Sequence, residues 1–143
     1  MSLCTIGTRS VVTIEPDAPA AAVACKMNDR SVGSVVVLED GKPIGIITDR
    51  DLVVRVLCKG RDPGSTKAKD VMTQNLATIG EQSDALSSLG RMREAHVRRL
   101  PIVGEDGSLI GIVALDDLAY HLARCHQELA EAIAAFPIPH EGG

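Results

Sequence analysis

The sequence predicts an α/β (α+β) fold made of two copies of a β-α-β-β-α unit. The first observation is an internal repeat: when the 143-residue chain is shifted by 65 positions, Met27 coincides with Met92, and the neighbouring matches keep their order. The second is a pair of Asp-Gly turns, at Asp40 and Asp106, each lying between apolar runs. Such a turn is a strong signal for a β-hairpin, so each copy should contain one.

The first copy should begin with a short apolar strand at residues 11–14. Asp17 and Pro19 then supply an N-cap and a first-turn proline, so a helix is expected from there to about Asn28. The remaining elements of this copy are expected as a strand at residues 34–38, a turn at 39–42, a strand at 43–47 and a helix at 49–58.

The second copy repeats this order. A strand is expected at residues 76–79, and a helix from Ser83 onward. The hairpin and the closing helix follow, with strands at residues 100–103 and 109–113, a turn at 105–107 and a helix at 116–135.

Between the copies, residues 60–65 (GRDPGS) have turn composition. Thr66 is expected to cap one short helical turn at residues 67–72, for which the first copy should have no counterpart. No role is assigned to residues 1–3 or 141–143. The predicted division is a first repeat at 8–60, a linker at 61–69, a second repeat at 70–120 and a C-terminal helix extension at 121–136.

Composition narrows the functional classes. The net charge of −4 argues against a nucleic-acid surface as the main function, and so does the presence of only Tyr120 and Phe136 as aromatic side chains besides histidine. Neither a run of eighteen apolar residues nor a secretory signal is visible, which favours a cytoplasmic protein without a membrane span. The four scattered cysteines favour free thiols over a disulfide framework.

The doubled motifs resemble those of tandem cystathionine-β-synthase (CBS) domains, the paired regulatory units called Bateman modules. The resemblance covers about residues 8–120. It rests on DVMT at 70–73 and on the hairpins SVVVLEDGKPIGIITDRDL and RLPIVGEDGSLIGIVALDDL. It implies a stand-alone CBS-domain protein whose two repeats pack through their sheets about a pseudo-twofold axis. It also implies two clefts for adenosine ligands, pairing into homodimers, and no enzymatic activity.

The stretch GIITDRDL, residues 45–52, contains the main candidate site. A carboxylate accepts two hydrogen bonds at once, so Asp51 at a helix start could hold both ribose hydroxyls. Thr48 could donate its hydroxyl toward a phosphate, beside the free amides of the helix N-terminus. The alternative is that both residues simply cap the helix. The Thr-x-x-Asp spacing in the family favours binding.

In the family, each site takes its base-binding wall from the other repeat, and the arginines after His96 would hold phosphate. The predicted main site is therefore Ile46, Thr48, Asp51, Thr73, Ala77, Val97, Arg98 and Arg99. Arg50 could equally reach phosphate or pair with a neighbouring subunit. The predicted second site is Thr8, Val12, Val32, Ile112 and Asp117.

The second site should be the weaker one. It departs from the family pattern twice: Ala114 stands where the first copy has Thr48, so a hydroxyl is missing, and the first copy is expected to lack the short helix that DVMT supplies to the second. The positions equivalent to Arg98 and Arg99 are Gly33 and Ser34, which carry no charge.

Other constellations are less specific. The last helix carries His121, Cys125 and His126, two of which could bind one metal ion. The favoured interpretation is an ordinary helix surface, so no structural metal is expected. No nucleophile elbow, His-Glu-x-x-His or phosphate-loop motif is present, so no catalytic residue is assigned.

The leading hypothesis is a regulatory module that binds an adenosyl ligand and signals occupancy to an unidentified protein. AMP, ADP and ATP are the expected ligands, with S-adenosylmethionine or NAD as further possibilities. The alternatives are a ligand-independent dimerisation scaffold and a redox-linked regulator that uses a cysteine. Dimerisation is expected through an apolar face of the last helix, formed by Leu118, Leu122, Leu129 and Ile133.

Overall fold

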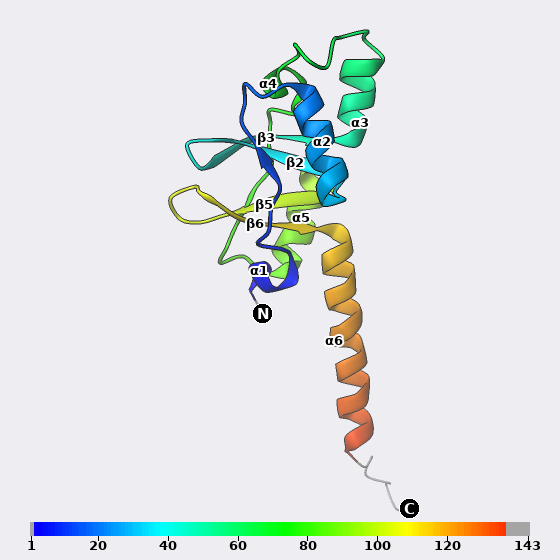
Figure 1. Ribbon diagram of the computed structural model, residues 1–143. Coiled ribbons are helices and arrows are strands. Elements are labelled where there is room, and N and C mark those ends of the chain that lie inside the picture. Colours follow the sequence, from blue (N-terminus) through cyan, green and yellow to red (C-terminus); the bar gives the residue numbers. More distant parts are fainter. Residues whose placement is uncertain (1, 137–143) are drawn as a thin grey trace, which may run out of the picture.

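Two three-stranded sheets form the centre of the molecule, and helices lie outside them (Figure 1). The computed structural model describes residues 2–136. The first repeat contains β1 Thr13–Ile14, α2 Ala20–Arg30, β2 Ser34–Glu39, β3 Lys42–Thr48, α3 Asp49–Leu52 and a π-helical segment, η1, Val53–Leu57. The second contains β4 Ile79–Gly80, α5 Ala85–Ala95, β5 Arg99–Val103, β6 Leu109–Ala114 and α6 Leu115–Ala135.

Both sheets have the same topology. In each, the first strand runs parallel to the second, and the second pairs with the third in an antiparallel hairpin. Even the irregularities match, because the register shifts after Val37 in one hairpin and after Ile102 in the other, 65 positions later. The predicted repeat of two β-α-β-β-α units is confirmed. The first strands are shorter than expected, at two residues each.

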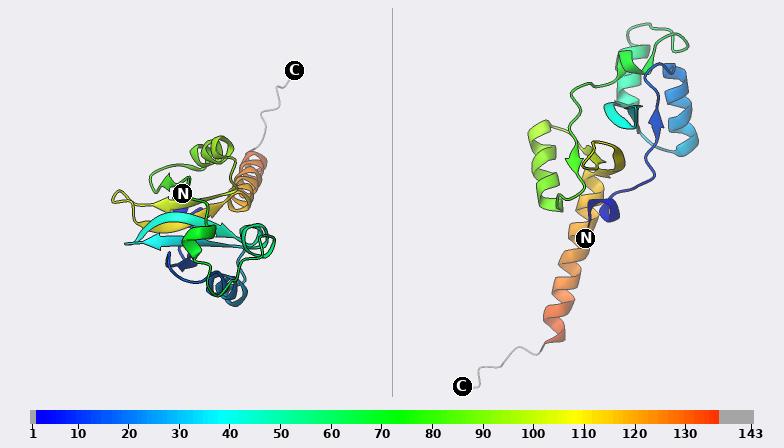
Figure 2. Two further views of the ribbon diagram at one scale, coloured as in Figure 1. Left: turned by 90° about the horizontal axis from the view of Figure 1, so that it is seen from above. Right: turned by 90° about the vertical axis from the view of Figure 1, so that its left-hand side faces the viewer.

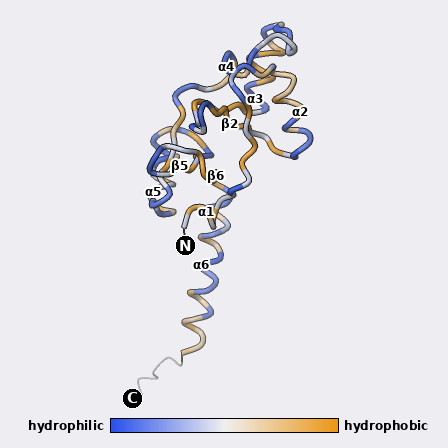
Figure 3. The backbone as a smooth tube through the Cα atoms, turned by 60° about the vertical axis from the view of Figure 1, so that its left-hand side comes forward, coloured by the Kyte–Doolittle hydropathy of each residue, from blue (hydrophilic) through white to orange (hydrophobic). Residues whose placement is uncertain are grey.

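The central strands bury both faces. Val35 and Val37 pack into the core beneath α2, and Val36, whose side chain points to the opposite face, is also buried. Leu100, Pro101 and Ile102 repeat this arrangement in β5. The two hairpins lie side by side in both views of Figure 2. The continuous apolar runs therefore reflect sheets covered on one side by helices and on the other by each other. Figure 3 shows these strands among the most apolar parts of the chain.

Two short helices bind the repeats together. Helix α4, Ala68–Val71, lies in the linker and buries Ala68 and Val71 in the first core. Helix α1, Leu3–Ile6, lies at the start of the chain and buries Leu3 in the second core. Since Leu3 lies 65 positions before Ala68, α1 is the counterpart of α4. The expectation that the first copy lacks this helix is wrong, and so is the view that Leu3 has no role.

The segments after these helices cross to a strand of one hairpin. Thr8 exchanges two backbone hydrogen bonds with Ile112 of β6, both of 2.9 Å. Thr73 does the same with Ile46 of β3, at 2.9 and 3.3 Å. Gly45 allows the second crossing, because a Cβ there would collide with the Met72 side chain. Each sheet is thus extended by the segment that follows a short helix.

Three local predictions are corrected. Asp17 does not cap α2, whose N-cap is Pro19; the Asp17 carboxylate instead contacts Lys67 and Lys69, at 3.3 and 3.1 Å. Thr66 does not cap α4, because its hydroxyl donates to the Asp62 carbonyl oxygen at 2.7 Å. The helix predicted at 49–58 is α-helical only as far as Leu52 and continues as the π-helical η1.

Helix α6 departs from the repeat by its length. Its first turns pack near α1 and α5, with Leu118 fully buried. The rest extends away from the sheets as a single helix (Figure 1). The predicted helix at 116–135 is confirmed almost to the residue.

Candidate functional site

The candidate site begins where β3 ends and α3 starts. The Thr48 N–H donates to Asp51 Oδ2 at 2.9 Å, and the Asp51 N–H donates to Thr48 Oγ1 at 3.2 Å. This reciprocal pair is a capping box, so the helix-cap interpretation of these two residues is correct. It leaves functional groups free, however. The Thr48 hydroxyl accepts in the cap and keeps its own proton for donation, and Asp51 keeps a second oxygen.

That second oxygen of Asp51 faces an arginine. Arg55 Nη2 lies 3.7 Å from Asp51 Oδ1, and Arg55 Nη1 donates to the Val71 carbonyl oxygen at 2.8 Å. The guanidinium therefore connects the Asp51 carboxylate to the end of α4. The Asp51 side chain is 17% exposed, so the carboxylate is largely enclosed but still reaches solvent.

A cleft of about 400 Å³ opens beside this junction. Its volume lies within the range typical of small-molecule sites. All eight residues of the predicted main site line it: Ile46, Thr48, Asp51, Thr73, Ala77, Val97, Arg98 and Arg99. They come from the first repeat, from the segment after α4 and from the second repeat. The cleft therefore exists only when both repeats are packed together.

Four further residues line the same cleft: Arg50, Asn75, Leu76 and His96. Asn75 and Leu76 were not predicted, although they lie between two predicted residues, Thr73 and Ala77. His96 ends α5 in the left-handed conformation, with φ of 55°, and so directs the chain into the cleft.

The charged side chains of the cleft are basic, apart from Asp51. Arg50, Arg98 and Arg99 all line it. Arg98 Nη2 lies 3.6 Å from Asp116 Oδ1, but both side chains are largely exposed, so this pair contributes little to stability. The guanidinium of Arg98 is therefore available to an anionic ligand. One carboxylate beside three arginines suits a ligand that carries hydroxyls at one end and phosphate at the other.

Comparison with protein-family profiles identifies the family to which this architecture belongs. The family profile described as "CBS domain" matches residues 4–57 and 68–124. The chain belongs to the CBS domain family. The two matched segments correspond to the two β-α-β-β-α repeats, so the chain carries a tandem CBS pair, as the sequence predicted.

Curated and solved relatives agree with this assignment. An uncharacterized protein of Methanopyrus kandleri is 40% identical over 119 residues, covering 82% of this chain and 61% of that protein's length. The structure of Hypoxic Response Protein I with two coordinated zinc ions matches with a TM-score of 0.76 and 27% identity, over 85% of this chain and 98% of that one.

A third relative is the CBS domain protein PAE2072 from Pyrobaculum aerophilum, whose structure is complexed with AMP. It matches with a TM-score of 0.75, over 87% of this chain and 99% of that one, at 19% identity. At this identity the likeness shows the shared fold.

The second predicted site of the CBS pair is less completely assembled. Thr8 and Ile112 are paired through their backbones, and Val12 and Val32 pack at the edge of the first core. The Asp117 carboxylate accepts from the Ala114 N–H at 2.8 Å, without the reciprocal hydroxyl bond. Asp117 also lines a different cleft, between α1 and α6. Gly33 is the position equivalent to Arg98 of the main site. The Asp49 carboxylate lies beside this glycine.

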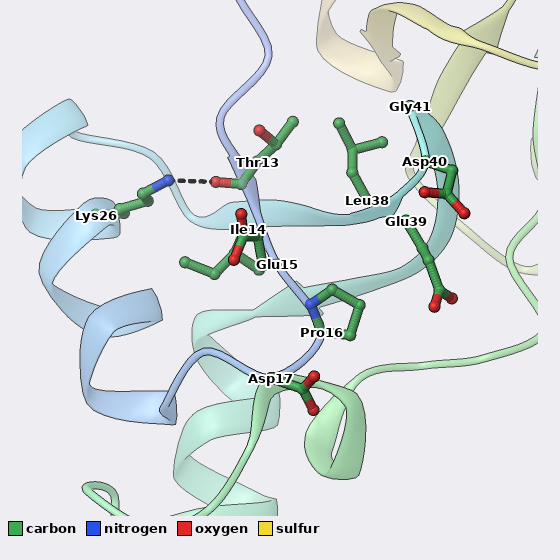
Figure 4. A pocket seen from close by; sticks show the side chains of 10 residues that line it. All are labelled: Thr13, Ile14, Glu15, Pro16, Asp17, Lys26, Leu38, Glu39, Asp40 and Gly41. Carbon is green, nitrogen blue, oxygen red and sulfur yellow. Dashed lines mark hydrogen bonds between the residues drawn. The ribbon is translucent and has the colours of Figure 1, made fainter.

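Another cleft of the CBS pair lies between β1, the segment that leads from β1 toward α2, the tip of the first hairpin and Lys26 of α2 (Figure 4). Its volume is about 530 Å³, and four carboxylates line it, those of Glu15, Asp17, Glu39 and Asp40. Lys26 donates to the Thr13 carbonyl oxygen at 2.6 Å. Hydrogen bonds from Lys69 and Lys67 lower the pKa of Asp17, so this carboxyl stays ionised. Such a cleft repels phosphate and does not suit a nucleotide.

Within residues 2–136, no group of three or more His, Cys, Asp and Glu side chains is arranged to hold a metal ion. In the same part of the chain, no helix combines the length and the apolar character needed to cross a membrane.

Proposed function

We propose that the CBS pair binds an adenosine nucleotide in the cleft between its repeats and acts as a non-catalytic sensor. The observation that carries this proposal is the composition of the cleft. A capping Thr48–Asp51 pair, an apolar wall from the other repeat and three arginines line one space.

The ribose would be held by Asp51. Oδ2 already accepts from the Thr48 N–H, and Oδ1 lies 3.7 Å from Arg55, at the long end of ion-pair distances. Each carboxylate oxygen has two lone pairs, so both ribose hydroxyls can still donate to the same group. The capping box holds this carboxylate in place before the ligand arrives, which reduces the entropy lost on binding.

The base and the phosphate would occupy the other two parts of the cleft. Ile46, Ala77 and Val97 offer the apolar surface that a flat purine requires. The phosphate would contact the Thr48 hydroxyl and a guanidinium, for which Arg98 and Arg99 are the candidates. AMP, ADP and ATP fit this division better than S-adenosylmethionine, because the latter carries no phosphate.

The AMP-bound relative supports the ligand class, since it has the same fold. The proposal assigns the main role to the Asp51 site, and a weaker one to the site of Asp117. A ligand bound between the repeats would favour the arrangement of the two repeats that it binds best. A partner protein that recognises this arrangement would thereby detect whether the site is occupied.

A melting experiment tests the proposal. A ligand that binds only the folded state increases the free energy of unfolding by about 2.7 kcal/mol when its concentration is a hundred times Kd. This increase raises the melting temperature by several degrees. The panel is AMP, ADP, ATP, S-adenosylmethionine and NAD, with ribose 5-phosphate and GMP as controls for the sugar phosphate and for the base. A phosphate-bearing adenosine ligand should produce the largest shift.

The second candidate function is a ligand-independent scaffold, favoured by the exposed apolar face of α6. If no ligand of the panel at millimolar concentration changes the melting temperature, the scaffold explains the protein better. A shift that depends on a reducing agent but on no nucleotide would instead favour the redox-linked regulator.

A further inference from the structure

The projecting part of α6 has a seam of small and apolar residues. Beginning at the buried Leu118, such residues recur at alternating spacings of four and three, as Leu122, Cys125, Leu129 and Ala132. This is the spacing of a and d positions in a coiled coil. The seam leaves the core after Leu118, and Leu122 and Leu129 are 45% and 59% exposed. Figure 3 shows apolar and polar turns alternating along this helix.

One position of this seam carries metal-binding chemistry. Cys125 Sγ and His121 Nε2, one helical turn apart, form a hydrogen bond of 3.6 Å. Zinc bonds of about 2.3 Å to sulfur and about 2.0–2.1 Å to nitrogen, at a tetrahedral angle, place the two ligand atoms about 3.5 Å apart. The observed separation is therefore that of two ligands on one zinc ion, without any movement of the helix.

The pair supplies only half of a site. Structural zinc takes four ligands, and the part of the chain described by the structure has no third His, Cys, Asp or Glu placed to join these two. Asp117, one turn before His121, is held by the Ala114 N–H. Residues 2–136 of one chain therefore leave two ligand positions of such a site open.

A second copy of the chain satisfies both requirements. In a parallel two-fold pair whose axis runs along the seam, residues at the a and d positions face their own counterparts, so seam packing of two α6 helices brings two Cys125 thiols together, each with its His121 one turn away. We propose that the α6 helices of two copies pair along this seam and bind one zinc ion through His121 and Cys125 of both copies. This proposal is independent of nucleotide binding at the Asp51 cleft.

The chemistry of the site balances simply. Each Cys125 thiol loses its proton to solvent when zinc binds, and each His121 coordinates as the neutral imidazole. Two thiolates and two imidazoles make a tetrahedral set of the kind that selects zinc over magnesium or calcium. The Leu122 and Leu129 layers on either side would exclude water from the ion.

The test uses the full chain, reduced and freed of metal. Zinc chloride is titrated while sedimentation velocity follows the mass and calorimetry follows the stoichiometry. The expected result is a dimer that binds one zinc ion per two chains. Cobalt in place of zinc should give the visible bands of a tetrahedral ion and a thiolate charge-transfer band in the near ultraviolet.

Variants identify the ligands. Cys125→Ser and His121→Ala should each weaken zinc binding at least about tenfold, and Cys125→Ser should abolish the thiolate band. His126→Ala and Cys25→Ser are the matched controls, since His126 adjoins the pair on another side of the helix and Cys25 is an exposed thiol on α2. Both controls should bind zinc as the unchanged protein does.

Three outcomes would overturn the proposal. One is zinc bound at one ion per chain without association. Another is zinc binding that survives Cys125→Ser. The third is a dimer that forms only under oxidising conditions, through a Cys125 disulfide, and takes up no zinc when reduced.

Discussion

At the scale of single residues, Thr48 and Asp51 cap α3 and also line the cleft that we propose to bind the nucleotide. In the capping box of α3 each donates one hydrogen bond from its backbone N–H and accepts one through its side chain, and both residues line the cleft. A residue with a structural bond is held in one rotamer, and a held rotamer loses less entropy when a ligand binds. The cap thus prepares the proposed ribose site.

Substitution of the two aspartates separates the sites. Asp51→Ala removes the proposed acceptor of two ribose hydrogen bonds, so the affinity for the best adenosine ligand should fall by roughly 2–4 kcal/mol, or about 30- to 1000-fold in Kd. Asp117→Ala should reduce this affinity less, because the site of Asp117 lacks the threonine hydroxyl. Titration calorimetry on both variants measures the difference.

Either substitution also weakens a cap by about 1 kcal/mol, so the melting of each unliganded variant serves as the control for folding. Should Asp117→Ala abolish binding while Asp51→Ala preserves it, the main site is the one at Asp117.

A hydroxyl introduced at position 114 should stabilise the protein. Ala114 is the N-cap of α6, with φ of −102° and ψ of 158°, and Thr48 caps α3 with nearly the same angles, −101° and 165°. In Ala114→Thr the new hydroxyl can accept from the Asp117 N–H. The free energy of unfolding should rise by about 1 kcal/mol in urea titrations.

Thr48→Ala is the reverse exchange and should lower the free energy of unfolding by a similar amount. A lower stability of Ala114→Thr would mean that the added methyl group collides with its surroundings.

At the scale of elements, α1 and α4 show how a four-residue helix can be stabilised by the core on which it packs. Neither is long enough to be stable alone. Each persists because it buries residues in a core: Leu3 in that of the second repeat, and Ala68 and Val71 in that of the first. The segment that follows each one then reaches across to β6 or β3.

Truncation of Leu3, the residue that α1 buries in the second core, should therefore lower the stability of the protein. Leu3→Ala leaves a cavity at a fully buried position and should reduce the free energy of unfolding by about 2–5 kcal/mol. Leu86→Ala is the matched control: Leu86 is 78% exposed, so its change should stay within about 0.5 kcal/mol. Urea unfolding followed by circular dichroism measures both. Equal effects would show that α1 is not anchored in solution.

At the scale of the whole molecule, each repeat has its own core, and the cleft is lined by both repeats. The proposed nucleotide site takes residues from both, and Thr8 and Thr73 connect each sheet to the segment after a short helix. Neither repeat keeps a complete environment if the other unfolds. The pair should behave as one cooperative unit.

Calorimetry tests this cooperativity. The protein should unfold in a single two-state transition, with equal calorimetric and van't Hoff enthalpies. Val71→Ala weakens the first core and Leu3→Ala the second, yet both should lower the same transition temperature. Two transitions, each moved by only one of the variants, would show that the repeats unfold separately.

The sequence by itself determined the duplicated unit, through matches 65 positions apart, and both hairpins, because an Asp-Gly turn is specified within about four residues. The expected lining of the main cleft came from the resemblance to the CBS family. Only the tertiary structure decided that Leu3 belongs to the core, since it packs in one cluster with Leu100 and Leu118, about a hundred positions later. The partners of Asp17 and Thr66 were likewise set by packing of the linker on α2. A local pattern states what a residue can do, and its neighbours in space determine which of those options is used.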